Sequence, residues 1–425
     1  MQSAHYEYIV VGNGLMGSAA TRYLSQWSDR VALIGPGEPA DHSRHEGVFS
    51  SHYDEGRLAH KHSQDPIWDV ISRAAVAVYP ELEAQSGITF HGPTGRVIAN
   101  RFSAEEQALI EQWIATVDPA GETLRFYPAS DRSWEALFPF LTFPAGYSLL
   151  HELAPAGYVN PRAMLRAQNA AAQQQGCTII DQLAVEVQSS ASGVTVKLAN
   201  GKRLGAKKVL IAAGAFTNFH GLLPRPLPLL LKTEATIWAD VAPETAERLR
   251  TMPAVGYNID DPDIDDIYMA PPLRYPDGQY KIKLGCNTKG ELWPATLTEV
   301  QAWFQRGDSD CDKPAMERAL KRILPEVAFG KITSHRCIVT YTPSGYPMID
   351  SVPSDEHGRL FVATGGNGSG AAGSDTLGLL AAGLLHDGRW IDGLPREPFL
   401  ATNQWGQSKK VLTKAQKRAL EKMYQ

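Results

Sequence analysis

The sequence lacks the features that mark several large classes of protein. No apolar stretch reaches the roughly 18 residues that a membrane-spanning helix needs, so we expect no membrane association. The net charge of −5 leaves no excess of basic residues, which argues against nucleic acids and membrane surfaces as partners. The N-terminus has no basic segment followed by an apolar core, as a secretory signal would, so we expect a cytoplasmic location.

Cysteine is also scarce, and its spacing excludes two common roles. The four cysteines, Cys177, Cys286, Cys311 and Cys337, form neither a CxxC pair nor a zinc-ligand pattern. The histidines within residues 39–62 follow no regular ligand spacing either, so no metal site is predicted. In a reducing compartment the four cysteines are expected to be free thiols.

What the sequence does contain is an ordinary globular composition and one strong motif at its start. With 425 residues, 43% of them hydrophobic, the chain can build two cores. Residues 8–11 are apolar and β-branched, which predicts a buried parallel strand. The G-x-G-x-x-G spacing follows at once, and a helix is expected from about residue 15 to residue 26. This context predicts dinucleotide binding but does not separate FAD from NAD. The residues expected to bind the cofactor here are Gly12, Gly14, Leu15, Met16 and Gly17.

The second predicted strand, residues 31–34, departs from the usual dinucleotide pattern. An acidic residue normally ends this strand and binds the ribose hydroxyls, but Gly35 stands in that place. Either Glu38 reaches back to the ribose, or the backbone and the polar segment that follows hold it. Residues 39–62 are rich in turn formers and predict a long loop that covers the cofactor. From this region we assign Gly35, Ser43, Arg44, Ser50, Ser51 and His52 to cofactor binding.

Two further strand ends run into small residues. The buried strand at 208–212 leads into Ala213 and Gly214, and the strand at 360–364 leads into residues 365–370, which are mostly glycine. Such junctions let the backbone approach a flat or anionic group closely. We add Val185, Ala213, Gly214, Gly366, Asn367, Gly368, Ser369 and Gly370 to the expected cofactor contacts.

The rest of the chain predicts a mixture of helices and strands. Helices are expected near 65–86, 103–117, 160–176, 296–306, 313–324, 376–385 and, in the basic tail, 409–422. Strands are expected within 88–100, at 178–180, as a hairpin over 185–200, and at 230–241 and 279–286, the last two in a larger, mostly antiparallel sheet.

The N-terminal motif and the two small-residue strand ends together resemble the FAD-dependent oxidoreductases of the D-amino-acid oxidase superfamily. Within it, the chain resembles the monomeric sarcosine oxidase and N-methyltryptophan oxidase group. The resemblance implies an α/β fold, with a Rossmann-like FAD domain built on a parallel sheet and a second domain with a large antiparallel sheet. The FAD domain would use residues 1–88, 145–228 and 330–425, and the substrate domain residues 89–144 and 229–329.

A local motif sharpens this resemblance. His335-Arg336-Cys337, followed by residues 347–350, resembles the family's motif whose cysteine carries FAD through a thioether. It implies a covalent bond from Cys337, with Asp350 near the cofactor. Cations at His335 and Arg336 would favour the reactive thiolate. Cys286 is the competing cysteine, and an unmodified thiol is the other alternative.

A second motif implies the residues of the reaction site. Residues 279–285 resemble a strand whose lysine lies above the flavin and speeds its reaction with O2. Lys283 matches, although Lys281 lies on the same face and the register could differ by two. Arg57 matches an arginine near the flavin, and Tyr268 an active-site aromatic. The predicted catalytic residues are Lys283, Arg57, His60 and Tyr268.

The positions expected to bind a substrate carboxylate have changed. His60 stands where the family has an arginine, and the place of the partner lysine is Gly370 or Ala372. A tyrosine two residues after the linking cysteine is replaced by Val339. The resemblance therefore implies an oxidase of a secondary amine or N-substituted amino acid other than sarcosine, with O2 reduced to H2O2.

Several alternatives remain open. Within the same fold, the substrate could be an Amadori-type fructosyl amine, or the enzyme could be a dehydrogenase with an acceptor other than O2. A NAD(P)-linked dehydrogenase and a flavin-bearing subunit without turnover are the other classes. The expected partners are a small amine and O2, and we expect a monomer.

Overall fold

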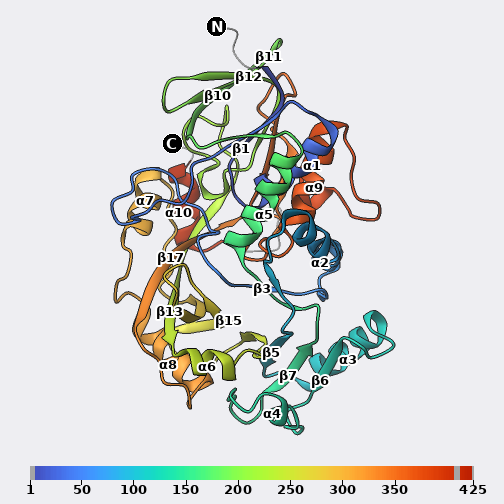
Figure 1. Ribbon diagram of the computed structural model, residues 1–425, viewed down its shortest axis with the longest axis vertical. Coiled ribbons are helices and arrows are strands. Elements are labelled where there is room, and N and C mark those ends of the chain that lie inside the picture. Colours follow the sequence, from blue (N-terminus) through green and yellow to red (C-terminus); the bar gives the residue numbers. More distant parts are fainter. Residues whose placement is uncertain (1–4, 406–411, 424–425) are drawn as a thin grey trace.

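Two sheets organise the chain in the computed structural model, which describes residues 5–405 and 412–423 (Figure 1). The first sheet has the strand order β10-β11-β12-β1-β2-β9, and β19 joins it beside β12 and carries β18. Its parallel core comprises β12, β1, β2 and β9, with β19 parallel to β12. The strands are β1 (His5–Val11), β2 (Val31–Ile34), β9 (Thr178–Ile180), β10 (Ala184–Ser190), β11 (Gly193–Leu198), β12 (Arg203–Ile211), β18 (Met348–Ser351) and β19 (Leu360–Thr364).

β1 is central because its sequence is apolar on both faces. Ile9 and Val10 are fully buried on opposite sides of the sheet. Helices α1 (Leu15–Trp27), α2 (Pro66–Ser86), α5 (Pro161–Gln174) and α9 (Ser374–His386) gather beside this sheet (Figure 1). α1 and α9 pack closely because Gly378 has no side chain, and a Cβ there would lie 2.5 Å from that of Ala19.

The second sheet is almost wholly antiparallel. Its order is β17-β13-β16-β15-β14-β5-β7-β6, and only the β14–β5 pair is parallel. The strands are β5 (Arg96–Asn100), β6 (Leu124–Tyr127), β7 (Ser148–Glu152), β13 (Leu230–Val241), β14 (Ala254–Tyr257), β15 (Ile264–Arg274), β16 (Tyr280–Thr288) and β17 (Ile332–Tyr341). A small third sheet joins β3 (Arg57–Ala59), β8 (Gly157–Val159) and β4 (His91–Gly92).

Alternation along the second sheet separates a core face from a cavity face. On β13, Ala235 and Ile237 enter the main hydrophobic core with residues of α7 (Leu297–Gln305) and α8 (Lys313–Ile323). Glu234 and Thr236 therefore point to the opposite face. The remaining helices are α3 (Ala104–Val117), α4 (Trp134–Leu137), α6 (Pro243–Arg248) and α10 (Lys414–Met423), with short 3₁₀ turns η1 (Gly214–Phe216) and η2 (Glu397–Phe399).

The predicted fold class is confirmed, and so are most helices. α2 begins where Asp65 accepts the amides of Ile67 and Trp68, and it ends at Gly87, whose φ is +69°. The sequence did not indicate β17, because each face of this strand carries a mixture of polar and apolar residues. β17 hydrogen-bonds to β13 in the second sheet, although the predicted boundary at 330 groups it with the FAD domain. The domain assignment stays a prediction.

Two expectations concern the tail and membranes. The predicted tail helix from 409 to 422 corresponds to α10, and residues 406–411 lie outside the described part of the chain. Among the residues that the structure describes, no helix is both long and apolar enough to span a bilayer.

Candidate active site

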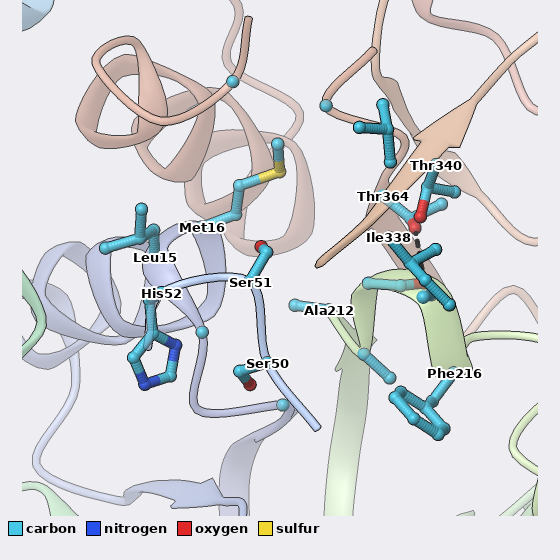
Figure 2. A pocket seen from close by; sticks show the side chains of 18 of the residues that line it. Leu15, Met16, Ser50, Ser51, His52, Ala212, Phe216, Ile338, Thr340 and Thr364 are labelled. Atoms are coloured by element: carbon cyan, nitrogen blue, oxygen red, sulfur yellow. Dashed lines mark hydrogen bonds between the residues drawn. The ribbon is translucent and has the colours of Figure 1, made fainter. Parts of the chain in front are cut away.

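A cavity of about 540 Å³ lies where the two sheets meet. Its walls come from the turn after β1, the loop at 48–52, the end of β12, strand β17 and residues 363–371. In Figure 2, Leu15, Met16 and the loop residues Ser50, Ser51 and His52 lie on one side, across from Phe216, Ile338, Thr340 and Thr364. Segments from both ends of the chain thus enclose one space.

One end of the cavity is formed by the N-terminal glycines. Gly12 has a φ of +120°, and a Cβ there would lie 2.3 Å from the carbonyl oxygen of Ala212. Gly14 has ordinary backbone angles and open space around its Cα, and no side chain caps the first amides of α1. These amides can therefore donate to an anion. Gly17 does not line the cavity; it packs α1 against the carbonyl of Gly12, since a Cβ would lie 2.0 Å from that oxygen.

The second glycine-rich segment lies beside β17. The amide of Asn367 donates to the carbonyl of Thr340 at 3.1 Å, and the amide of Thr342 donates to Asn367 Oδ1 at 3.0 Å. Gly370 allows close contact with Met16, because a Cβ there would lie 3.0 Å from the Met16 Cε. Residues 363–371 all line the cavity.

The structure shows where Glu38 goes. Its carboxylate accepts two hydrogen bonds from Arg162, at 2.6 and 2.7 Å, and it does not line the cavity. Gly35 packs against Asn13, with a Cβ position 2.5 Å from the Asn13 amide nitrogen. His52 lines the cavity with a buried, unpartnered Nδ1, and burial lowers its pKa to about 4. The wall near Gly35 is therefore formed by backbone and neutral side chains.

A polar cluster comprises Arg57, Tyr268, Glu234 and Cys337, all of which line the cavity. Arg57 donates to the carbonyl of Ser51 at 2.8 Å, and its Nη1 lies 3.4 Å from the hydroxyl of Tyr268. That hydroxyl donates to Glu234 Oε1 at 2.5 Å. Arg57 Nη2 lies 3.9 Å from Cys337 Sγ. Burial raises the pKa of Tyr268, and the charge of Glu234 raises it further, so the phenol stays protonated.

Lys283 lies just behind this cluster rather than on the cavity wall. Its Nζ forms an ion pair with Asp54, donates to the carbonyl of Gly56 at 3.1 Å and lies 5.0 Å from the centre of the Tyr268 ring. Burial and then the charge of Arg57 lower the pKa of Lys283 to about 8, while Asp54 opposes both. Lys281 instead pairs with Asp240 at 2.6 Å. Between the two lysines, only Lys283 neighbours the cluster.

Strand register also distinguishes the two candidate cysteines. Cys337 on β17 lines the cavity, whereas Cys286 belongs to the hydrophobic core on the opposite face of the sheet. The expectation that His335 and Arg336 activate the thiol is wrong. Arg336 packs over Trp303, and burial lowers the pKa of His335 to about 3. Burial raises the pKa of Cys337 itself, and Arg57 is the nearby cation that opposes this rise.

The substituted carboxylate-binding positions bring no positive charge to the site. His60 lines the cavity, but burial, with help from Arg96, holds its pKa well below the ordinary value, so the ring is neutral. Gly370 has no side chain and Ala372 is buried. Arg96 reaches the cavity wall from β5, but its Nη2 pairs with Glu152 at 2.9 Å.

Four other predicted residues do not reach the cavity wall. Ser43 and Arg44 lie in an exposed turn held by Asp41. Val185 does not line the cavity, whereas its neighbour Ala184 does. Asp350 is buried away from the cavity wall, where its carboxylate accepts a hydrogen bond from the amide of Ala401 at 3.1 Å. The other expected cofactor contacts line the cavity: Gly12, Gly14, Leu15, Met16, Gly35, Ser50, Ser51, His52, Ala213, Gly214, Cys337, Gly366, Asn367, Gly368, Ser369 and Gly370.

Comparison with known proteins agrees with this geometry. The family model described as FAD dependent oxidoreductase matches residues 7–384. The chain belongs to this family. It is 25% identical over 387 residues to N-methyl-L-tryptophan oxidase from Yersinia pestis, covering 90% of this chain and 95% of that protein.

Solved structures show the same fold at lower identity. NikD, described as an unusual amino acid oxidase essential for nikkomycin biosynthesis, aligns with a TM-score of 0.73 and 18% identity, over 94% of this chain and 98% of that one. Amadoriase I from Aspergillus fumigatus, a fructosyl amine:oxygen oxidoreductase, aligns with a TM-score of 0.67 and 18% identity, over 93% and 89% of the two chains.

The cavity fits the cofactor of this family. Open space at Gly14 and uncapped helix amides suit a pyrophosphate, and small residues at 212–215 suit a flat ring system. Cys337 lines the same cavity, within the cluster around Arg57. The protein is therefore an FAD-dependent oxidoreductase.

Proposed function

We propose that this protein oxidises a secondary amine or an N-substituted amino acid, passes the electrons to O2 and holds FAD through a thioether to Cys337. The imine product hydrolyses to an amine and a carbonyl compound, and O2 becomes H2O2. The observation that carries the proposal is the convergence of Arg57, Tyr268 and Cys337, with Lys283 behind them, on the wall of a cavity that the N-terminal glycines also line. The substrate class is supported by the name of the Yersinia pestis relative, N-methyl-L-tryptophan oxidase, since N-methyl-L-tryptophan is an N-alkylated amino acid.

Bound FAD would accept a pair of electrons and a hydrogen from the carbon next to the amine nitrogen. The protein supplies orientation and charge. Arg57 and Tyr268, joined at 3.4 Å, give one rigid polar wall against which the substrate is placed. The Lys283 ammonium, screened from solvent, would stabilise negative charge that develops when O2 is reduced.

A fructosyl amine oxidase is the second substrate candidate, supported by the fold shared with Amadoriase I. A dehydrogenase that passes electrons to another acceptor is the second candidate for the electron route. Oxygen consumption during amine turnover separates oxidase from dehydrogenase.

The test is a panel of amines, each mixed with the holoenzyme first without O2 and then with it. We expect secondary amines to bleach the yellow flavin and air to restore it, with H2O2 as the product. Fast turnover of sarcosine at low millimolar concentration would contradict the substrate part of the proposal.

A further inference from the structure

Glu234 places a carboxylate in the cavity that no motif indicated. It is half-buried, it lines the cavity from β13, and its Oε1 accepts the hydroxyl of Tyr268. We propose that Glu234 binds a positively charged group of the substrate, and that the substrate is an amine with a second basic nitrogen, such as an N-alkylated diamine. This inference rests on the proposed amine oxidation.

The position of Glu234 places it within the substrate compartment. Glu234 pairs with Cys337 across the β13–β17 ladder, so both side chains point to the same face of the sheet. Asn287 on β16 lines the cavity too, one residue beyond the Ala235–Cys286 pair. The carboxylate therefore lies on the same sheet as Cys337, next to Tyr268.

The charges around the cavity are otherwise paired. The cations at and behind its wall each lie beside a carboxylate, although Arg57 and Lys283 share Asp54. These pairs are Arg57 with Asp54 at 3.5 Å, Lys283 with Asp54, Arg96 with Glu152 at 2.9 Å, and Lys232 with Glu291 at 2.8 Å. Within the described part of the chain, Glu234 is in no ion pair, and Arg57 reaches it only through the hydroxyl of Tyr268.

An unpaired carboxylate in a partly buried cavity favours a cationic ligand. Removing a carboxylate from water is costly unless a hydrogen bond or an opposite charge compensates it. The hydroxyl of Tyr268 satisfies one oxygen, and a ligand cation would satisfy the other. His60, Gly370 and Ala372 supply no positive charge that would bind an anionic substrate instead.

The chemistry of the reaction then selects the second nitrogen as the charged one. The reacting nitrogen must be neutral when the electrons leave, because a protonated amine has no lone pair to stabilise the product imine. A second basic nitrogen can stay protonated and pair with Glu234 throughout turnover. An N-alkylated diamine has both features.

The first experiment measures binding rather than turnover, using two ligands that cannot be oxidised as amines. Butyltrimethylammonium and pentanoate, which are similar in length and opposite in charge, are titrated into the holoenzyme and followed by the flavin spectrum and by calorimetry. We expect the cation to bind at least tenfold more tightly. In Glu234→Gln, we expect the cation to lose about tenfold in affinity, the size of one ion pair of about 1.4 kcal/mol, while pentanoate binds no more weakly.

Controls separate a charge effect from a folding effect. Asp240→Asn removes a carboxylate from the same strand, where it pairs with Lys281 away from the cavity, and should leave cation affinity unchanged. An unchanged visible flavin spectrum in Glu234→Gln shows that the variant folds. Equal or tighter binding of pentanoate in the native enzyme overturns the inference. So does unchanged cation affinity in Glu234→Gln.

A second readout links the inference to activity. The ratio of kcat/KM for N-methyl-1,4-diaminobutane to that for N-methylpentylamine should exceed ten and fall towards one in Glu234→Gln. A ratio near one in the native enzyme contradicts the inference. If neither amine reduces the flavin but the cation still binds through Glu234, the proposed amine oxidation fails and the cation site stands.

Discussion

Asp54 and Lys283 form a buried ion pair directly behind Tyr268, with side chains 4% and 1% exposed. Asp54 also lies 3.5 Å from Arg57 and accepts the hydroxyl of Tyr275 at 3.1 Å. Burial would raise the pKa of Asp54, but Lys283 and then Arg57 hold it below its ordinary value. One carboxylate therefore fixes two of the cations near Tyr268.

Replacing Asp54 should impair both stability and the reaction with O2. Asp54→Asn leaves Lys283 buried without its counter-charge, which lowers the lysine pKa further and costs about 3 kcal/mol of unfolding free energy. We expect slower reoxidation of reduced enzyme by O2 at pH 7, measured by stopped flow, and a lower urea midpoint. Asp240→Asn breaks the Lys281 pair on the same sheet and should leave reoxidation unchanged. Equal effects of the two variants on reoxidation would contradict a positioning role for Asp54.

Reoxidation should depend on pH through Lys283. Its folded pKa is lowered to about 8, so the ammonium is present below that pH and is lost as pH rises through it. Because the cation stabilises charge on reduced O2, the rate constant should be highest below pH 8 and fall above it. Lys283→Met should be at least about tenfold slower, corresponding to about 1.4 kcal/mol of barrier, and should show no such transition. The same pH transition in Lys283→Met would assign it to another group.

The linkage to the flavin should depend on one cysteine. We expect FAD to stay with the acid-denatured chain of the native protein and to be released from Cys337→Ala, as seen by mass and absorption after denaturation. Cys286→Ala is the matched control, since that thiol is buried on the opposite face of the sheet. Retention of FAD in denatured Cys337→Ala, or its loss from denatured Cys286→Ala, would contradict the assignment.

Replacing Gly12 or Gly14 by alanine should have different effects, on stability in the first case and on FAD affinity in the second. Gly12→Ala forces a Cβ to 2.3 Å from the carbonyl oxygen of Ala212 at a φ of +120°, so the variant should be destabilised even without cofactor. Gly14→Ala meets no atom within 4 Å and should fold normally while binding FAD less tightly, because the new methyl group blocks the pyrophosphate. Thermal melts of apoprotein and FAD titrations check both. Equal apoprotein stability of the two variants would be inconsistent with these roles.

Local motifs made much of this site predictable. The spacing of Gly12, Gly14 and Gly17 predicts a strand, a turn and a helix within a short stretch, and the steric roles of these glycines follow from backbone geometry alone. Ser103 and Glu106 likewise form a capping box at the start of α3, and the spacing of the two residues can be recognised in the sequence. Such features depend on neighbours in sequence, which is why they can be recognised without a structure.

Residues brought in by strand pairing could not be predicted in this way. Glu234 and Arg96 belong to strands whose register decides which side chains face the cavity. A shift of one residue would turn both side chains to the opposite face of the sheet. Asp54 lies in a polar loop and its partner Lys283 is far along the chain, so no local pattern indicates this ion pair. Arg336 is adjacent to Cys337 and therefore points to the opposite face of the sheet, whereas His335 shares the face of Cys337 but is kept neutral by burial.

We propose that the Arg57–Tyr268–Cys337 cluster and Lys283 serve amine oxidation by FAD with O2 as acceptor. Anaerobic mixing of the holoenzyme with secondary amines, followed by air, tests it most directly. We predict that at least one amine bleaches the flavin, and that air then restores the colour and yields one H2O2 per amine oxidised. A flavin that no amine in the panel bleaches, or that stays bleached in air, would contradict the account.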